Sequence, residues 1–202
     1  MGAMFDEKAD LAIVDAVFQL HGLTSVGFRK DELRAAKTPD RRLLREDQTV
    51  AYVEVKSPQY DDWLESQLEF SPPMKIVGGA KKDPTFSRIA RHIDTAAKQF
   101  YSVNPSRNVP NILFFINHNH QSHWGDLYEV LTRHFLDNNG NKHATMLNIS
   151  EGKIRNSKNQ IDCFIWYEKK SEVITGYIFS NENTEHCQEV CKLLSLDFSK
   201  IK

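Results

Sequence analysis

Hydrophobic residues recur along the chain at spacings that predict helices and strands in a definite order. Residues 6–21 and 85–102 carry apolar positions three or four residues apart, which is the spacing of an amphipathic helix. Residues 25–29 read as a short strand, and residues 41–46 and 50–57 as a hairpin with its turn near Asp47-Gln48. Residues 111–117, NILFFIN, read as a strand buried on both faces. The predicted order is helix, strand, hairpin, helix, strand.

The remaining pattern predicts further strands and helices on the same sheet. Helices are expected over about 124–137 and 183–195, and strands over 145–149, 162–168 and 173–180. Because no Gly-, Pro- or Ser-rich linker divides the chain, residues 1–202 are interpreted as one domain. Its core covers about residues 5–117, and residues 118–202 elaborate it. Residues 1–3, which precede Met4, look like an expression scar.

The hairpin brings two acids and a lysine toward one strand end. Side chains alternate along residues 50–57, so Glu54 and Lys56 share one face while Val53 and Val55 point to the other. With Asp47-Gln48 at the apex, position 40 pairs roughly with position 55. Asp40 would then lie diagonally across from both Glu54 and Lys56.

Paired carboxylates of this kind suit a metal ion. Two carboxylates about 4 Å apart repel by roughly 4 kcal/mol at an effective dielectric near 20, which a shared proton or cation relieves. Oxygen ligands favour Mg²⁺ or Mn²⁺. Such a metal would activate a water molecule, and Lys56 could orient that water or stabilise charge on a phosphate.

Other acid–lysine triplets in the chain lack this setting. Glu151-Gly152-Lys153, Glu168-Lys169-Lys170 and Asp6-Glu7-Lys8 have no upstream Pro-Asp and hairpin, and they are interpreted as a polar loop, a charged turn and a helix start. The plain alternative for Glu54 and Lys56 is an exposed strand face that carries an ion pair.

The sequence TPD, a hairpin and then VEVKSP resembles the PD-(D/E)xK nuclease superfamily, which has the restriction-endonuclease-like fold. The resemblance covers about residues 5–117 and implies an α/β (α+β) αβββαβ core, whose mixed central sheet is flanked by helices and extended by the C-terminal strands and helix. It implies that Asp40 and Glu54 are metal ligands, that the main-chain carbonyl of Val55 is a further ligand, and that Lys56 is the catalytic lysine. Arg41 departs from the pattern, because an apolar residue often follows the Pro-Asp.

Two helices offer further candidates for this site. Gln99 belongs to a polar stripe with Arg88, His92 and Thr95 on the second predicted helix, and in related nucleases this side often faces the cleft. The alternative is a solvated helix face. On the first helix, Glu7 or Asp10 is a weaker candidate for an extra metal ligand.

The net charge of −1 means that nucleic acid would have to bind at a local basic patch. One group of candidates lies near the proposed cleft. A second group, which includes Lys81 and Lys82, lies in residues 58–83, a long segment that could cover the substrate or be an ordinary insertion. The candidates of the first group are Arg29, Lys30, Arg34, Lys37, Arg41 and Arg42.

The sequence also excludes several classes of protein. No apolar run reaches the roughly 18 residues of a membrane span, and no secretory signal is visible. Three cysteines without a spaced framework indicate a reducing cytoplasm. Cys187 and Cys191, four residues apart, are expected to face the core of the last helix. His118, His120 and His123 read as a polar loop after a strand, with a transition-metal site as the less favoured alternative.

The sequence therefore favours a Mg²⁺- or Mn²⁺-dependent endonuclease that hydrolyses DNA. A non-catalytic relative that binds nucleic acid or protein, and a nuclease that cuts RNA, remain the alternatives. Many enzymes of this superfamily act as homodimers, and the residues themselves leave the oligomeric state open.

Overall fold

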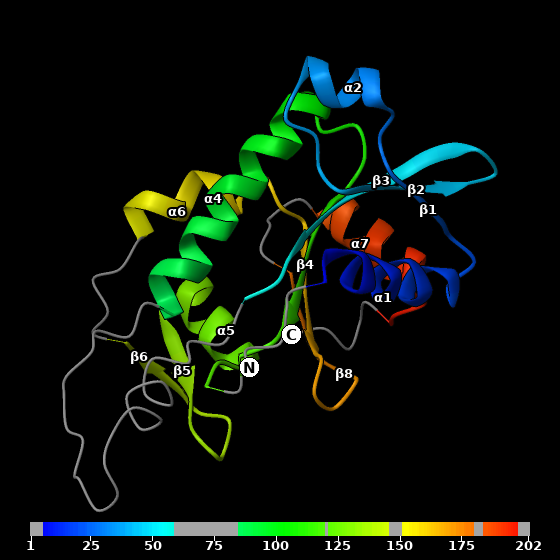
Figure 1. The fold of residues 1–202 in the computed structure, drawn as a ribbon. Coiled ribbons are helices and arrows are strands. Elements are labelled where there is room, and N and C mark those ends of the chain that lie inside the picture. The colour runs from blue at the N-terminus through cyan, green and yellow to red at the C-terminus, as the bar shows by residue number, and fades with distance from the viewer. Residues whose placement is uncertain (1–5, 59–84, 120, 146–150, 180–183, 198–202) are drawn as a thin grey trace, which may run out of the picture.

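The structure is a computed structural model that describes residues 6–58, 85–119, 121–145, 151–179 and 184–197. Its helices and strands alternate along the chain (Figure 1). In chain order they are α1 (Glu7–Gln19), β1 (Thr24–Val26), α2 (Lys30–Ala35), β2 (Arg41–Arg45), β3 (Gln48–Lys56), α4 (Thr85–Val103), β4 (Asn111–Asn117), α5 (Trp124–Thr132), β5 (His134–Leu136), β6 (Lys142–Ala144), α6 (Glu151–Lys158), β7 (Cys163–Glu168), β8 (Val173–Phe179) and α7 (Thr184–Leu193).

A six-stranded mixed sheet forms the centre of the described fold. Its strand order is β1-β2-β3-β4-β7-β8. The neighbours β3 and β4, and β4 and β7, run parallel, and the outer pairs run antiparallel. The carboxyl ends of β3, β4 and β7 therefore meet at one edge of the sheet, which is where α/β proteins commonly place ligands. The expectation of a mixed α/β fold with a central sheet is confirmed.

Helices cover both faces of this sheet. In Figure 1, α4, α5 and α6 lie to one side of it, and α1 and α7 lie to the other. The central strand β4 is buried along its whole length, as the sequence predicts. Its side chains alternate, so Phe114 packs with Phe18 of α1 while Phe115 joins the cluster under α4. Two hydrophobic layers thus hold β3 and β4 from opposite sides.

The β2–β3 hairpin turns one residue earlier than predicted. Glu46 and Asp47 both have positive φ, 51° and 63°, which is the backbone of a two-residue turn that matches the twist of the strands. A register shift between Leu43 and Leu44 then brings Arg41 opposite Val53. Asp40, the residue before β2, consequently lies across from Glu54, and the predicted pairing of position 40 with position 55 is wrong by one residue.

Several elements differ from the expected ones. Helix α5 ends at Thr132, before the predicted residue 137, because Arg133 caps it with a left-handed backbone at φ 62°. The next residues enter β5, which pairs with β6 over 142–144, whereas a strand was expected over 145–149; residues 146–149 lie outside the described residues. The short α2 was not predicted, and the triplet at Glu151 begins α6 rather than a loop.

Within the described parts of the chain, no helix is long and apolar enough to cross a membrane. Of the long segment 58–83, only Pro58 belongs to the described residues, so its predicted role over the substrate lies outside them.

Candidate active site

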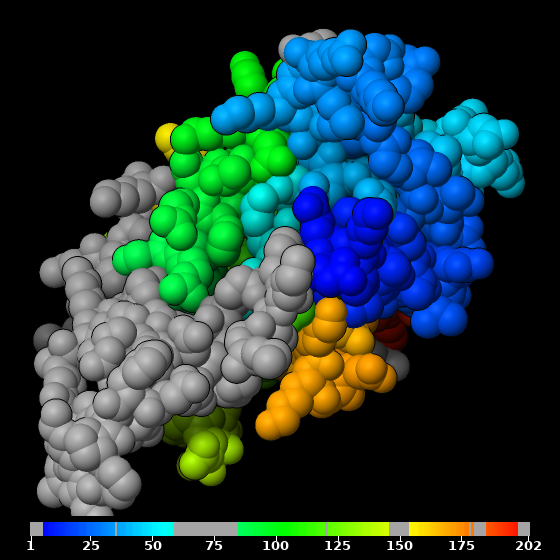
Figure 2. Space-filling view, viewed as in Figure 1, coloured from blue at the N-terminus to red at the C-terminus, as the bar shows by residue number. Residues whose placement is uncertain are grey.

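A cleft of about 320 Å³ opens at the carboxyl end of β3. Its wall is contributed by α1, by the residues around the open end of the hairpin and by α4. Figure 2 shows the β2–β3 hairpin reaching the surface between α1 and α4, with α2 above. The residues that line the cleft are Glu7, Asp10, Leu11, Asp40, Glu54, Val55, Lys56, Ser57 and Gln99. All four residues that the sequence selected as metal ligands or catalytic groups, and also Gln99, belong to this set.

Two hydrogen bonds join Asp40 to the neighbouring residues Glu54 and Val55 across the hairpin. The main-chain N–H of Asp40 donates to Oε2 of Glu54 at 3.2 Å, and the main-chain N–H of Val55 donates to Oδ2 of Asp40 at 2.8 Å. Each carboxylate thus accepts a hydrogen bond from a backbone N–H at the point where β2 and β3 separate. These contacts fix both acids beside the backbone of Val55, as a shared metal site requires.

Glu54 carries a strongly perturbed carboxyl group. Glu54 is only 1% exposed because α4 covers this face of β3. The alternative that Glu54 lies on an exposed strand face is therefore wrong. Burial, and secondly the charge of Asp40, raise the pKa of Glu54 to about 8, although Lys56 and Gln99 act to lower it. Lys56 donates to Oε1 of Glu54 from the same face of the strand. The pair of acids therefore has one cation beside it within the described structure and favours a second positive charge.

Gln99 joins the site from α4. Its Nε2 donates to the carbonyl oxygen of Thr38 at 3.0 Å, which ties the helix to the segment that precedes Asp40. Its Oε1 is buried and accepts no hydrogen bond from the described residues. A buried acceptor without a donor is costly, so this oxygen suits a water molecule or a substrate hydroxyl in the cleft. Gln99 thus lines the cleft, as expected from the sequence, and the alternative of a solvated helix face is wrong at this residue.

His92 belongs to α4, the helix that also carries Gln99, and it lies near Lys56 of β3. Its ring packs edge-on against Phe115, with centroids 6.3 Å apart, and Phe115 is the register partner of Lys56 in β4. Burial lowers the pKa of His92 to about 4, with smaller effects from Lys56, Arg91 and Arg88. A neutral imidazole therefore lies near the lysine, and the sequence selected this position only as part of a polar stripe.

On the other wall of the cleft, Asp10 of α1 contacts the residues that directly follow strands β3, β4 and β7. Its buried carboxylate accepts hydrogen bonds from Ser57 Oγ at 2.6 Å and from Lys169 Nζ at 2.6 Å, and it contacts His118 Nε2 at 2.8 Å. Burial alone would raise the pKa of Asp10, but the hydrogen bonds from Lys169, Ser57 and His118 hold it below its usual value. Lys169 does lie in a turn, as predicted for Glu168-Lys169-Lys170, but its ammonium group contacts Asp10, which the interpretation as a charged turn did not include.

Two of the predicted nucleic-acid-binding arginines have partners inside the protein. Arg41 makes a two-pronged ion pair with Asp15 of α1, at 2.9 and 3.2 Å. Arg42 donates to Glu32 at 2.7 Å and stacks over Phe28. These contacts also explain why an arginine follows the Pro-Asp, since Arg41 fastens the hairpin to α1.

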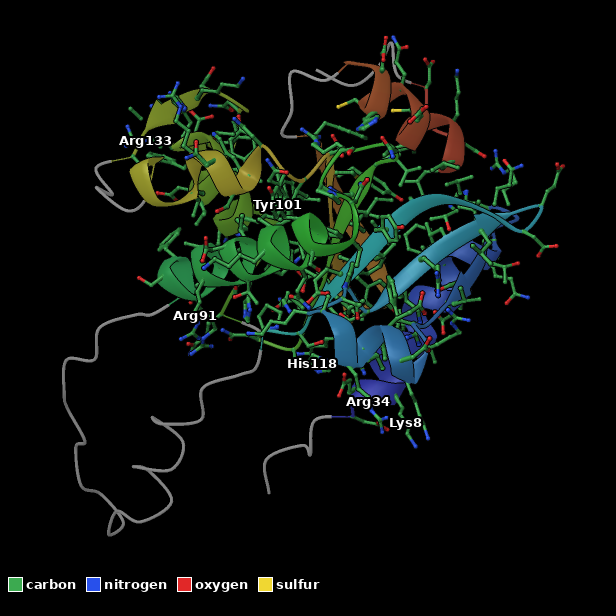
Figure 3. All side chains as sticks on the ribbon, turned by 90° about the horizontal axis from the view of Figure 1, so that it is seen from above. Lys8, Arg34, Arg91, Tyr101, His118 and Arg133 are labelled. Carbon is green, nitrogen blue, oxygen red and sulfur yellow. The ribbon has the colours of Figure 1, made fainter. Side chains whose placement is uncertain are left out.

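The other predicted basic residues differ in their surroundings. Arg29 lies near Asp31 and Glu32, each at 3.5 Å. Lys81 and Lys82 lie outside the described residues. The predicted residues Lys30, Arg34 and Lys37 are exposed and form no ion pair within the described residues. The same holds for Lys8 and Arg91, and Lys8, Arg34 and Arg91 lie toward one side of the molecule in Figure 3.

The acid pair can be tested as a place for Mg²⁺ or Mn²⁺. Among the described residues, no three His, Cys, Asp or Glu side chains come together as a metal-binding group. Mg²⁺ nevertheless binds through one or two carboxylates and keeps several waters. Asp40 and Glu54 supply two carboxylates whose mutual repulsion, together with burial, raises the pKa of Glu54, and a proton or a cation between them would relieve that repulsion; Gln99 Oε1 provides an acceptor for water. The donor set fits such an ion.

Comparisons with models of protein families, with curated proteins and with solved structures found no match for this chain.

Proposed function

We propose that this protein is a Mg²⁺- or Mn²⁺-dependent nuclease that hydrolyses phosphodiester bonds, with DNA as the substrate. The observation that carries the proposal is the hydrogen-bonded pair of Asp40 and Glu54, with Lys56 on Glu54, at the edge of a cleft. The resemblance of TPD and VEVKSP to the PD-(D/E)xK superfamily agrees with it, and so does the mixed sheet flanked by helices. The restriction-endonuclease-like core is part of the same proposal.

Asp40 and Glu54 would hold the metal ion, with the main-chain carbonyl of Val55 as a further ligand. When bound, the ion supplies a water molecule of lowered pKa and neutralises charge on the phosphate. The ion would also keep Glu54 ionised, because a positive charge beside the carboxylate opposes the effect of burial.

The protein's own groups would orient and stabilise the reacting atoms. Lys56 presents an ammonium group at the cleft and would stabilise negative charge on the phosphate, or orient the attacking water. Gln99 Oε1 would accept a hydrogen bond from that water or from a substrate hydroxyl. The exposed cations Lys8, Arg34 and Arg91 would contact backbone phosphates further from the cut.

The proposal is tested by digestion of supercoiled and linear DNA with Mg²⁺ or Mn²⁺. The expected result is cutting by the wild type and loss of cutting in Asp40→Ala and Lys56→Ala. Asp31→Ala and Lys192→Ala remove the same groups from exposed positions in α2 and α7 and serve as matched controls. Equal cutting by the wild type and both site variants would reject the assignment. A parallel digest of structured RNA separates the two nucleic acids.

A module that binds nucleic acid without cutting it is the second candidate. The specific observation in its favour is that both oxygens of Glu54 already accept hydrogen bonds, from Lys56 and from the N–H of Asp40. Calorimetric titration with Mn²⁺ discriminates between the two, since a binding module would take up no Mn²⁺ in a way that depends on Asp40 and Glu54.

A further inference from the structure

Asp10 and the pair Asp40–Glu54 lie in one cleft but are neutralised in different ways. Asp10 is 1% exposed and Glu54 is 1% exposed, so both are buried carboxylates that require a partner. Within the described residues, Lys56 is the lysine beside the pair, and its ammonium group donates to Oε1 of Glu54. Asp10 has its own ammonium group, from Lys169, at 2.6 Å. The pair thus has two carboxylates and one lysine, whereas Asp10 has a lysine of its own.

The oxygens of Asp10 are already engaged by the protein. Oδ1 accepts from Lys169, and Oδ2 accepts from Ser57 and lies at 2.8 Å from the ring nitrogen of His118. Ser57, His118 and Lys169 follow directly on β3, β4 and β7, so the backbone of the sheet holds each of them in position. In Figure 3, His118 lies between Arg91 of α4 and Lys8 of α1.

A metal ion bound to Asp10 would have to displace this arrangement. A divalent cation and the ammonium group of Lys169 would compete for the same oxygen and would repel each other. The side chain of Lys169 is only 33% exposed, so moving it out would break a partly buried ion pair. The pair of Asp40 and Glu54 also has a lysine, because Lys56 donates to Oε1 of Glu54. That lysine leaves Asp40 with only a backbone N–H on its Oδ2 within the described residues, so Asp40 can take a metal ion without displacing an ammonium group from its own oxygens.

We propose that Lys169 is a resident cation beside the cleft, bound to Asp10, so that the site takes one divalent metal ion, at Asp40 and Glu54, and Asp10 stays closed to a second. The inference rests on the proposed function and specifies its metal stoichiometry. Asp10 then acts as a positioning residue, which holds α1 against the ends of three strands while Lys169 keeps its charge neutralised. Replacing the lysine by a neutral side chain should open a second ion site.

The test is the number of Mn²⁺ ions bound by the full chain, measured from the signal of free Mn²⁺ by electron paramagnetic resonance. We expect one ion for the wild type, none for Asp40→Asn, and one for Asp10→Asn with an affinity within about threefold of the wild type. Lys169→Met should bind a second, weaker ion, which the double variant with Asp10→Asn loses. Lys170→Met, at the exposed next residue, is the matched control and should bind one ion.

The outcomes separate the inference from the proposed function. Two ions on the wild type, one of which is lost in Asp10→Asn, would overturn the inference alone, as would a single ion on folded Lys169→Met. Lys169→Gln replaces the methionine variant if thermal unfolding shows that the latter does not fold. No Mn²⁺ uptake by the wild type, or full uptake by Asp40→Asn, would remove the proposed metal site and the inference with it.

Discussion

Replacing Glu54 by glutamine is expected to stabilise the metal-free protein at alkaline pH and to change little in acid. The pKa of Glu54 is raised from 4.5 to about 8, so between these values the folded state keeps a proton that the unfolded state has lost. The free energy of unfolding therefore falls as pH rises through this window, and the full loss persists above it. Glutamine keeps the shape of the protonated acid and carries no such proton.

The size of the effect follows from the same shift. At about 1.36 kcal/mol per pKa unit, the ionised carboxylate costs the folded protein on the order of 5 kcal/mol above about pH 8. Near pH 5 the cost is only about 1 kcal/mol. The difference in stability between Glu54→Gln and the wild type should therefore grow by about 4 kcal/mol between pH 5 and pH 8.5. Because all other titrating groups are common to both proteins, comparing them isolates Glu54.

Urea unfolding in the presence of a chelator measures this difference. Glu46→Gln makes the same change at the exposed tip of the hairpin, and this control should follow the wild type at both pH values. Added Mn²⁺ should restore the wild type at pH 8.5 and leave Glu54→Gln unchanged, because a cation offsets the buried charge. Parallel pH profiles for the wild type and Glu54→Gln would refute the reasoning that Glu54 is a desolvated acid beside Asp40.

Three further predictions concern the neighbours of this acid. Lys56→Gln should reduce DNA cleavage by about 100-fold or more while Mn²⁺ affinity stays within a few-fold, and equal losses of both would contradict its role in phosphate or water chemistry. The imidazole of His92, with a pKa of about 4, should remain neutral down to about pH 5 in nuclear magnetic resonance titrations, and a midpoint near 6.5 would refute its burial. Arg41→Gln and Asp15→Asn should each destabilise the fold by about 1 kcal/mol, with the double variant costing little more than either, whereas additive losses would show that the two groups do not interact.

The convergence of Asp40, Glu54 and Lys56 could be predicted because it depends on local rules. Strand alternation places Glu54 and Lys56 on one face, and a tight hairpin returns the chain to Asp40. The register was missed by one residue, since non-glycine residues with positive φ form the turn and a bulge shifts the strand after it. The burial of Glu54 was missed because it depends on α4, which lies far away in the sequence.

The α1 side of the cleft shows why the remaining residues escaped prediction. Asp10 and Lys169 are separated by 159 positions and meet only because β3, β4 and β7 are neighbours in the sheet. No local sequence pattern predicts that β3, β4 and β7 are neighbours. From the sequence alone, Lys169 cannot be distinguished from a lysine in an exposed charged turn. The short α2 was missed for a related reason: its six residues are too few to display a helical period, and the side chain of Glu32 on the N–H of Arg29 secures its first turn.

The central claim is that Asp40, Glu54 and a divalent metal ion together cut a phosphodiester bond, and plasmid relaxation measured against Mg²⁺ concentration tests it most directly. The account predicts saturable, Mg²⁺-dependent nicking or linearisation by the wild type. A chelator and the substitution Glu54→Gln should each abolish this cutting. Because Glu54→Gln is expected to be at least as stable as the wild type, its loss of cutting would not result from unfolding. Cleavage by Glu54→Gln at the wild-type rate, or no cleavage of DNA or RNA by the wild type with Mg²⁺ or Mn²⁺, would contradict it.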